Sequence, residues 1–382
     1  MYTNYTTEKT RILSKNVENR KIKMYIHTPI EGYPNDVEKV VSEEGFGKND
    51  YIETTKSLIV VTAPGPGSGK MATCLSQLYH ENKKGISAGY AKYETFPIWS
   101  IPLKHPVNLA YEAATIDLND VIMIDPFHLE AYDKIAVNYN RDVEVFPLLK
   151  AIFEKIYGKS PYNSPTDMGV NMAGFAIKND EAACKASKEE IIRRYYQTLK
   201  YNYYGKFADE CVDKAEMLMN QVGISKNDRK CVSVCLKKQE KENVPVIALE
   251  LKNGKVITGK RSLLFGAPAA LLLNALKSLA KIDDSLTLIA RNVIDPIQKL
   301  KVNDLKNHNP RLHAEEVLIA LAIQATTNTL SELALSQLPK LKGCQAHSSI
   351  ILPESDLKTF KKLGIEASKA SLISLNNSAF NG

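Results

Sequence analysis

The sequence lacks long hydrophobic runs, closely spaced cysteines and a strong excess of charge of one sign. Its longer apolar stretches, such as 58–63 and 267–273, fall far short of the roughly 18 to 20 residues that a membrane span needs. Six cysteines in 382 residues are too sparse for a disulfide framework. Lysine and arginine number 50 against 43 aspartates and glutamates, and the net charge of +7 is spread along the chain. These absences argue against a membrane protein, a disulfide-rich secreted domain and a nucleic-acid-binding protein.

No secretory signal is visible, because residues 1–5 are not a basic segment followed by an apolar one. Together with the sparse cysteines, this predicts a cytoplasmic protein. Hydrophobic residues make up 44% of the chain and charged residues 24%, close to the average for folded soluble proteins. A length of 382 residues suffices for two or three domains.

The order of strand and helix patterns predicts an α/β protein in four parts. Residues 1–175 are expected to form an α/β domain, 176–243 a helical domain, 244–370 a second α/β domain and 371–382 a frayed tail. Two aliphatic runs are typical of buried parallel strands, and the pair Asn253-Gly254 predicts a hairpin with a type I′ turn. Predicted strands lie at 22–27, 57–62, 121–125, 285–290 and 348–352, the hairpin at 244–258, and helices at 70–82, 147–156, 180–242 with breaks near Gly205 and Gly223, 267–280, 315–325, 331–338 and 356–363.

The strongest local signal is a glycine-rich loop between a predicted strand and a predicted helix. Such a loop presents backbone N–H groups where the helix dipole is positive, which favours phosphate, and Lys70 can add a point charge as in a Walker A loop. The pattern departs from Walker A at Pro64 and Met71, which replace a glycine and the magnesium-binding hydroxyl. A turn needed only for tight packing is the alternative. We assign the cofactor-binding role to Gly65, Gly67, Ser68, Gly69, Lys70 and Thr73.

Asp125 ends the predicted strand 121–125 and has the form of a Walker B carboxylate, which holds Mg²⁺. Lys104 and His105 lie between the two signals, and a mixture of acids, lysine and histidine suits a phosphoryl or acyl transfer site. The polar loop 164–174 resembles a lid over substrate. For each of these residues a solvated loop or a helix cap is the alternative. We assign catalytic roles to Lys70, Asp125 and Asp167, and substrate contacts to Lys104, His105, Thr166 and Asn171.

A second chemical signal lies near the C-terminus. His313 precedes two glutamates at a helix start, and Cys344 and His347 precede a predicted strand. Histidine and cysteine in this order are similar to zinc deaminases, and they predict a zinc site at His313, Cys344 and His347. A deaminase would have Cys-x-x-Cys opening a helix, so a capped helix and a buried cysteine are the stronger interpretation.

Four strings together point to a family. Residues 30–36, 63–74, 164–174 and 309–313 closely resemble the uncharacterised protein family 0371, a bacterial family whose domain has no known function. The resemblance covers nearly all of residues 22–366. It implies an α/β front part, a helical middle and a deaminase-like α/β tail, and it implies no reaction. Members are longer at the N-terminus and residues 1–20 match poorly, so a shortened member is expected.

The sequence thus predicts an enzyme of phosphoryl or group transfer that binds a nucleotide or another phosphorylated small molecule at Gly65–Lys70. Nucleotide and Mg²⁺ are the cofactors that this interpretation suggests. Two alternatives remain open, a zinc-dependent hydrolase or deaminase of the His313 type and a non-catalytic oligomeric binding protein. The tyrosine-rich stretch 195–204 would form the interface of a homo-oligomer.

Overall fold

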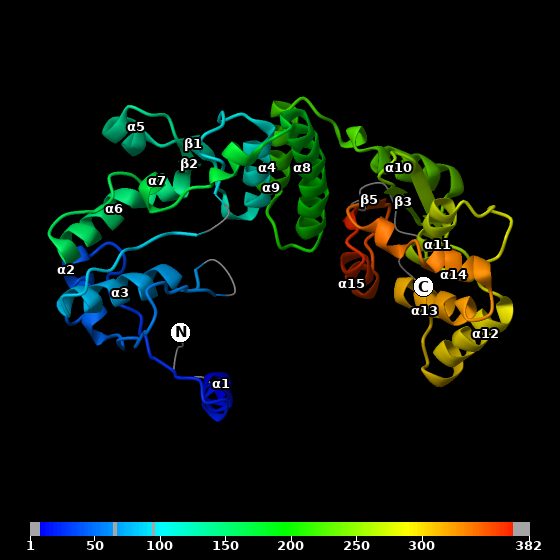
Figure 1. The fold of residues 1–382 in the computed structure, drawn as a ribbon, viewed down its shortest axis with the longest axis horizontal. Helices are drawn as coiled ribbons and strands as arrows, with labels where there is room; N and C mark the ends of the chain where they lie inside the picture. The colour runs from blue at the N-terminus through cyan, green and yellow to red at the C-terminus, as the bar shows by residue number, and fades with distance from the viewer. Residues whose placement is uncertain (1–7, 64–66, 94–95, 370–382) are drawn as a thin grey trace. The chain divides into compact units, whose positions relative to one another are not determined.

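The computed structural model describes residues 8–63, 67–93 and 96–369. The chain forms two compact units, unit 1 from Met1–Leu103 and Asp120–Lys178, and unit 2 from Lys104–Asn119 and Asn179–Gly382. Residues 104–119, which the sequence placed with the first domain, thus cluster with the helices that follow residue 179. The fold is mixed α/β with many helices and two small sheets (Figure 1). All six cysteines are free thiols.

Unit 1 is mainly helical, and its described residues include one short antiparallel strand pair. In that pair, β1 and β2 align Ile122 with Tyr139 and Ile124 with Val137. The core gathers Phe46, Leu75 and the buried side of α6. The elements of unit 1 are α1 (Glu8–Asn19), α2 (Val37–Val40), η1 (Phe46–Lys48), α3 (Lys70–Lys83), β1 (Ile122–Ile124), α5 (Pro126–Tyr132), β2 (Val137–Tyr139), α6 (Asn140–Tyr157), α7 (Pro165–Met168) and η3 (Met172–Ala176).

Helix α6 starts earlier than the sequence predicted and contains Pro147 in its interior. Proline removes one backbone hydrogen bond and normally favours a helix start. The apolar spacing nevertheless continues across it, and Val143, Phe146 and Leu149 are all buried. Packing of this continuous face outweighs the missing hydrogen bond.

The predicted strand 57–62 is wrong. No residue of 57–62 lies in a strand, and the residues Leu58 and Val60 are 80% and 78% exposed. A buried parallel strand needs hydrogen-bonded neighbours and helices over both faces. The described part of unit 1 offers only the β1–β2 pair. The predicted strand at 22–27 is likewise limited to an isolated bridge residue, His27.

Unit 2 is built around a four-stranded sheet of order β4-β3-β5-β6, in which only the β5–β6 pair is parallel. Its elements are α4 (Pro106–Ala114), η2 (Ile116–Leu118), α8 (Asp180–Tyr203), α9 (Asp209–Gln221), η4 (Lys226–Asp228), α10 (Lys230–Glu242), β3 (Val246–Glu250), β4 (Val256–Lys260), α11 (Ala267–Ala280), α12 (Arg291–Lys299), η5 (Leu300–Asp304), α13 (Ala314–Ala325), α14 (Thr329–Leu335), η6 (Leu338–Leu341), β5 (Gln345–Ser348), α15 (Glu354–Lys362) and β6 (Glu366–Lys369).

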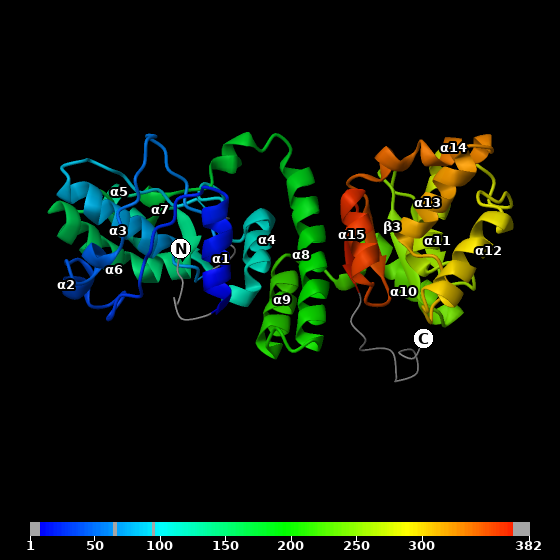
Figure 2. The same cartoon turned by 90° about the horizontal axis from the view of Figure 1, so that it is seen from below.

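Residues 246–249 of strand β3 are all apolar because both faces of the strand are covered. Val246 and Ala248 pack with the buried cysteines of α10, while Ile247 and Leu249 join the larger core with α11 and α13. Alternate residues of a strand point to opposite faces, so residues 246–249 are all apolar where both faces are covered, and the half-buried Glu250 ends the strand. Helices α4, α8 and α9 form a second, separate core within the same unit (Figure 2).

Most elements predicted for unit 2 are confirmed, with three corrections. The helical stretch 180–242 is broken at Gly205 and Gly223, both with positive φ, as predicted. The hairpin is confirmed, but only Gly254 of the pair Asn253-Gly254 has positive φ, so its turn is not type I′. Residues 285–290 form turns over the core instead of a strand. The predicted strand 348–352 is displaced to β5.

Among residues 8–63, 67–93 and 96–369 we find no helix with the length and apolar character that crossing a bilayer requires.

Candidate functional site

The glycine-rich loop leads directly into α3. Gly69 is the N-cap with φ of +79°, and Lys70 is the first helical residue. Gly67 also has positive φ, and a Cβ added there would meet nothing within 4 Å. The N-cap Gly69 makes no side-chain cap hydrogen bond, and the first turn of α3 contains no acidic residue. The structure thus places Gly67, Ser68, Gly69 and Lys70 together at one helix start, while Gly65 lies outside the described residues.

Two parts of the predicted phosphate loop differ from expectation. Thr73 is buried in α3, whereas a cofactor contact needs an accessible hydroxyl. The segment before the loop is extended and exposed where a buried strand was predicted. A glycine turn at 67–69 therefore leads into α3, and no strand is described at 57–62.

Asp125 is fully buried and caps α5. One carboxylate oxygen accepts the backbone N–H of His128 at 3.0 Å. The other accepts the hydroxyl of Thr166 at 2.6 Å and its backbone N–H at 3.3 Å. Both oxygens are thus engaged by protein donors, and the residues around Asp125 do not fit a magnesium site.

Asp167 and Ser164 form the capping box of α7, the alternative that the sequence left open for this loop. Asp167 also accepts the Tyr132 hydroxyl at 2.9 Å. His128 lies beside them, with its Nδ1 at 3.1 Å from the Ser164 hydroxyl and 3.9 Å from Asp167. A nucleophilic triad uses the two ring nitrogens separately, one for serine and one for the carboxylate. Because both contacts here involve Nδ1, these residues do not form such a triad.

Asn171 ties its loop to the segment near residue 97. Its side-chain amide donates to the carbonyl of Phe96 at 3.0 Å and accepts the N–H of Ala173 at 3.0 Å. Its backbone forms a bridge with Ile98. The polar side chains of this loop that we expected to contact substrate, Thr166 and Asn171, thus make hydrogen bonds within unit 1.

His105 is brought into a cluster that the sequence did not reveal, whereas Lys104 is exposed. The His105 ring Nε2 lies 3.1 Å from Asp180 Oδ1 and 3.6 Å from the Cys184 sulfur. Within the described residues this is the one group of three potential metal ligands whose atoms lie within 4.8 Å of one another. Asp180 and Cys184 were missed because they lie 75 and 79 residues from His105 in the chain.

The structure does not bring His313, Cys344 and His347 together as a zinc site. His313 caps α13, and its Nδ1 lies 3.2 Å from Asp356 Oδ2. The Cys344 thiol is directed to the carbonyl of Lys340. His347 is buried with its Nδ1 at 2.9 Å from the Ser368 hydroxyl. Each residue therefore has a separate structural partner.

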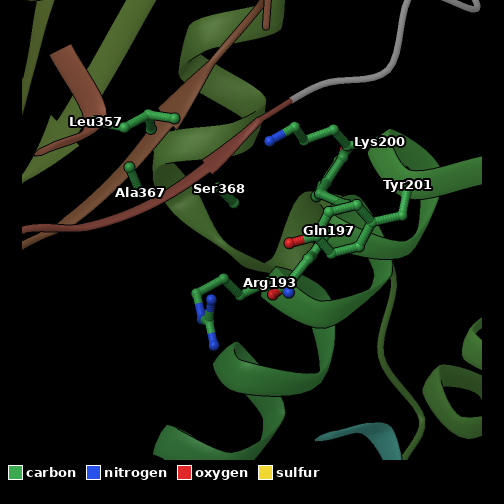
Figure 3. A pocket seen from close by; sticks show the side chains of 8 residues that line it. Arg193, Gln197, Lys200, Tyr201, Leu357, Ala367 and Ser368 are labelled. Carbon is green, nitrogen blue, oxygen red and sulfur yellow. The ribbon is translucent and has the colours of Figure 1, made fainter. Parts of the chain in front are cut away.

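A pocket of about 140 Å³ lies in unit 2 between α8 and β6 (Figure 3). Its polar lining includes Arg193, Lys200 and Ser368. Arg193 is paired with Glu190, and Ser368 also accepts a hydrogen bond from the buried guanidinium of Arg229. None of the lining residues is acidic. Glu190 balances the charge of Arg193, and the sequence did not indicate this pocket because α8 and β6 are far apart in the chain.

The buried His347 predicts a pH dependence of stability. Burial, and then the nearby Arg229 charge, lower the pKa of His347 from 6.5 to about 3. Between these values the unfolded chain binds a proton that the folded chain does not, so stability is lost as the pH falls through this range. The titration of His347 should lower the free energy of unfolding by about 1.4 kcal/mol for each unit that the pH falls within this range. Urea unfolding at a series of pH values measures the slope.

His347→Asn is the matching variant, because asparagine can keep the hydrogen bond to Ser368 and does not titrate. Its unfolding free energy should vary less steeply than that of the wild type below pH 6.5. Parallel slopes for the two proteins would contradict the assignment.

Comparison with known families covers nearly the whole chain. The family model described as "Domain of unknown function DUF1846, N-terminal" matches residues 1–223, and the model "Domain of unknown function DUF1846, C-terminal" matches residues 227–372. The boundary between them lies just before α10, within unit 2.

Similar proteins come from streptococci. A UPF0371 protein of Streptococcus pyogenes serotype M5 is 57% identical over 351 residues, which cover 92% of this chain and 71% of the relative. A UPF0371 protein of Streptococcus equi subsp. zooepidemicus is 56% identical over the same shares of the two chains. Their names state no activity. The chain therefore belongs to the uncharacterised UPF0371 family, whose two domains are the N- and C-terminal DUF1846 domains.

Proposed function

We propose that the chain binds a phosphorylated small molecule, such as a nucleotide or a sugar phosphate, at Gly67–Lys70, and that this binding serves a group-transfer reaction. The proposal rests on how helix α3 begins. This helix begins on a left-handed glycine, without a side-chain cap and without an acidic residue in its first turn.

Two other helices of unit 1 are capped by side chains. Asp125 accepts an N–H group at the start of α5, and Ser164 does so at the start of α7. The first N–H groups of any helix have no partner within the helix and carry the positive end of its dipole. The N-cap residue of α3 is a glycine, which has no side chain for this role, and an anion suits such a helix start.

The loop residues support an anion in two further ways. Gly67 and Gly69 adopt positive φ, and open space surrounds the Cβ position of Gly67, so a ligand can approach the backbone closely. Lys70 supplies a positive charge at the same helix start, and the compact ammonium group suits phosphate oxygens. The backbone and one lysine together would neutralise a phosphate.

This site would work without a metal held by Asp125. Met71 stands where a Walker A loop has its magnesium-binding hydroxyl, and Asp125 is buried with both oxygens engaged. The proposed ligand is therefore recognised as an anion by backbone and lysine.

The experiment is a binding screen followed by a variant. Inorganic phosphate, nucleotides and sugar phosphates are tested for a rise in melting temperature, since a ligand that binds the folded state stabilises it. For a phosphorylated ligand found in this way, Lys70→Ala should weaken binding by about 10- to 100-fold, the value of a hydrogen bond to a charged group. Isothermal titration calorimetry measures the affinity.

The matched control is Lys83→Ala, which removes the same side chain from the other end of α3. It should leave the affinity unchanged. If Lys70→Ala and Lys83→Ala both bind every such ligand as tightly as the wild type, the proposal is wrong.

A further inference from the structure

We propose that His105, Asp180 and Cys184 form a binding site for a divalent metal ion of the zinc type. Imidazole nitrogen, carboxylate oxygen and thiolate sulfur are all ligands that zinc accepts. All three residues belong to unit 2. The site is distinct from the C-terminal residues considered for zinc on sequence grounds and from the loop at the start of α3.

The fold fixes the three ligands on two packed helices. His105 is the N-cap of α4, and Asp180 and Cys184 lie one turn apart at the start of α8. Helices α4 and α8 lie side by side (Figure 2) and share a core that includes Leu109 and Ile191. The ligand positions therefore follow from the packing of two regular elements, which gives a site its precision.

The three residues lie at separations close to those of ligands around a tetrahedral zinc ion. With bonds of about 2.3 Å to sulfur and about 2.0–2.1 Å to nitrogen and oxygen, tetrahedral angles separate nitrogen from sulfur by about 3.6 Å, nitrogen from oxygen by about 3.3 Å and sulfur from oxygen by about 3.5 Å. In the structure, Nε2 of His105 lies 3.6 Å from the Cys184 sulfur and 3.1 Å from Asp180 Oδ1, and the sulfur lies 3.7 Å from the other oxygen, Asp180 Oδ2. A metal ion bound through one carboxylate oxygen would therefore need a rotation of the Asp180 carboxylate.

Metal binding changes the protonation of His105 and Cys184. Without metal, Asp180 accepts from the ring Nε2 of His105 at 3.1 Å, and Nδ1 accepts the N–H of Val107 at 3.3 Å. A metal ion bound to Nε2 leaves the ring proton on Nδ1. Nδ1 can then no longer accept the N–H of Val107, so the hydrogen bond that caps α4 is lost. The thiol of Cys184 loses its proton to become a ligand. Two anionic ligands then balance the two charges of the ion.

The site has an open side. Three protein ligands leave the fourth position of a tetrahedral ion for water or a small molecule, as in catalytic zinc sites. The side chain of His105 is 13% exposed and that of Asp180 is 65% exposed. A pocket of about 370 Å³ is lined by Cys184 together with Lys188, Ile192 and Asp228. Solvent and a metal ion can therefore reach the ligands.

The test measures metal binding directly. The full chain, purified without a histidine tag and treated with a chelator, is titrated with Zn²⁺ in competition with a coloured chelator, and with Co²⁺ while its absorption spectrum is recorded. The wild type should bind one ion per chain, and Co²⁺ should produce the charge-transfer band of a thiolate ligand. Cys184→Ala should lose that band and bind zinc more weakly, by more than the roughly 10- to 100-fold that loss of an outer-shell partner costs.

Two further variants separate coordination from folding. His105→Asn keeps a good N-cap for α4 and removes the ring nitrogen, so it should weaken zinc binding while the circular dichroism spectrum stays unchanged. Cys211→Ala removes another half-buried thiol of unit 2 outside the cluster and should bind both ions as the wild type does. The proposal is overturned if the wild type binds no zinc, or if folded Cys184→Ala and His105→Asn bind it with wild-type affinity.

Discussion

Replacing Gly259 by alanine should destabilise unit 2 by about 3 kcal/mol, because the added methyl group has no space. Gly259 lies in β4 where the strand crosses the start of α11. A Cβ atom there would lie 2.2 Å from the backbone nitrogen of Leu271 and 2.6 Å from the carbonyl oxygen of Ala267. These atoms belong to a helix backbone and cannot move away by a change of rotamer. Urea unfolding followed by far-ultraviolet circular dichroism measures the effect.

Gly89→Ala is the matched control for this substitution. Gly89 is exposed, and a Cβ atom there would meet nothing within 4 Å. Its unfolding midpoint should remain close to that of the wild type. Equal midpoints for the two alanine variants would show that β4 and α11 do not approach as closely as the structure indicates.

The contact at Gly259 illustrates how far the sequence determines unit 2. Local signals predicted the hairpin and the helix at 267–280, because turn residues and apolar spacing lie within each segment. A glycine inside a strand indicates a close approach of some backbone. Which backbone approaches depends on the packing of β4 against α11, and no local pattern specifies it.

The incorrect strands have a common physical cause. The runs 57–62 and 285–290 consist largely of apolar and β-branched residues, which favour strands when neighbouring strands are available. In the second run Leu288 and Ile289 are buried in the core without a strand partner, while Asp283 and Ser285 form a turn before them. Burial of apolar side chains needs only contact with the core. A strand also needs an open edge of a sheet, which is a property of the whole fold.

The candidate sites show the same division between local and distant information. Gly67, Gly69 and Lys70 are neighbours in the chain, so their placement at one helix start was predictable from spacing alone. His105 was selected only for its residue type, since Cys184 is 79 residues away. Contacts at such separations result from helix packing, and a single sequence contains no direct record of them.

Replacing Asp125 by alanine should lower the free energy of unfolding by about 3 to 5 kcal/mol, because buried donors would lose the charged group that accepts them. The Asp125 carboxylate joins two helices, since it accepts the N–H of His128 in α5 and both the hydroxyl and the N–H of Thr166 in α7. Trp99 is the sole tryptophan and belongs to the same unit, so its fluorescence during urea unfolding measures the effect. Asp125→Asn keeps an acceptor oxygen and should lose less.

Glu130→Ala removes an exposed carboxylate from the same helix and should change the free energy of unfolding by less than about 0.5 kcal/mol. The comparison also distinguishes the two roles considered for Asp125. A carboxylate that only binds Mg²⁺ could be removed with little effect on folding in the absence of the ion, because it would have no protein donors to satisfy. If Asp125→Ala and Glu130→Ala unfold at the same urea concentration without Mg²⁺, the hydrogen bonds between α5 and α7 are not what keeps Asp125 in place, and the metal-binding role regains support. A large loss confined to Asp125→Ala would instead establish that this aspartate positions α7, and with it the loop that follows.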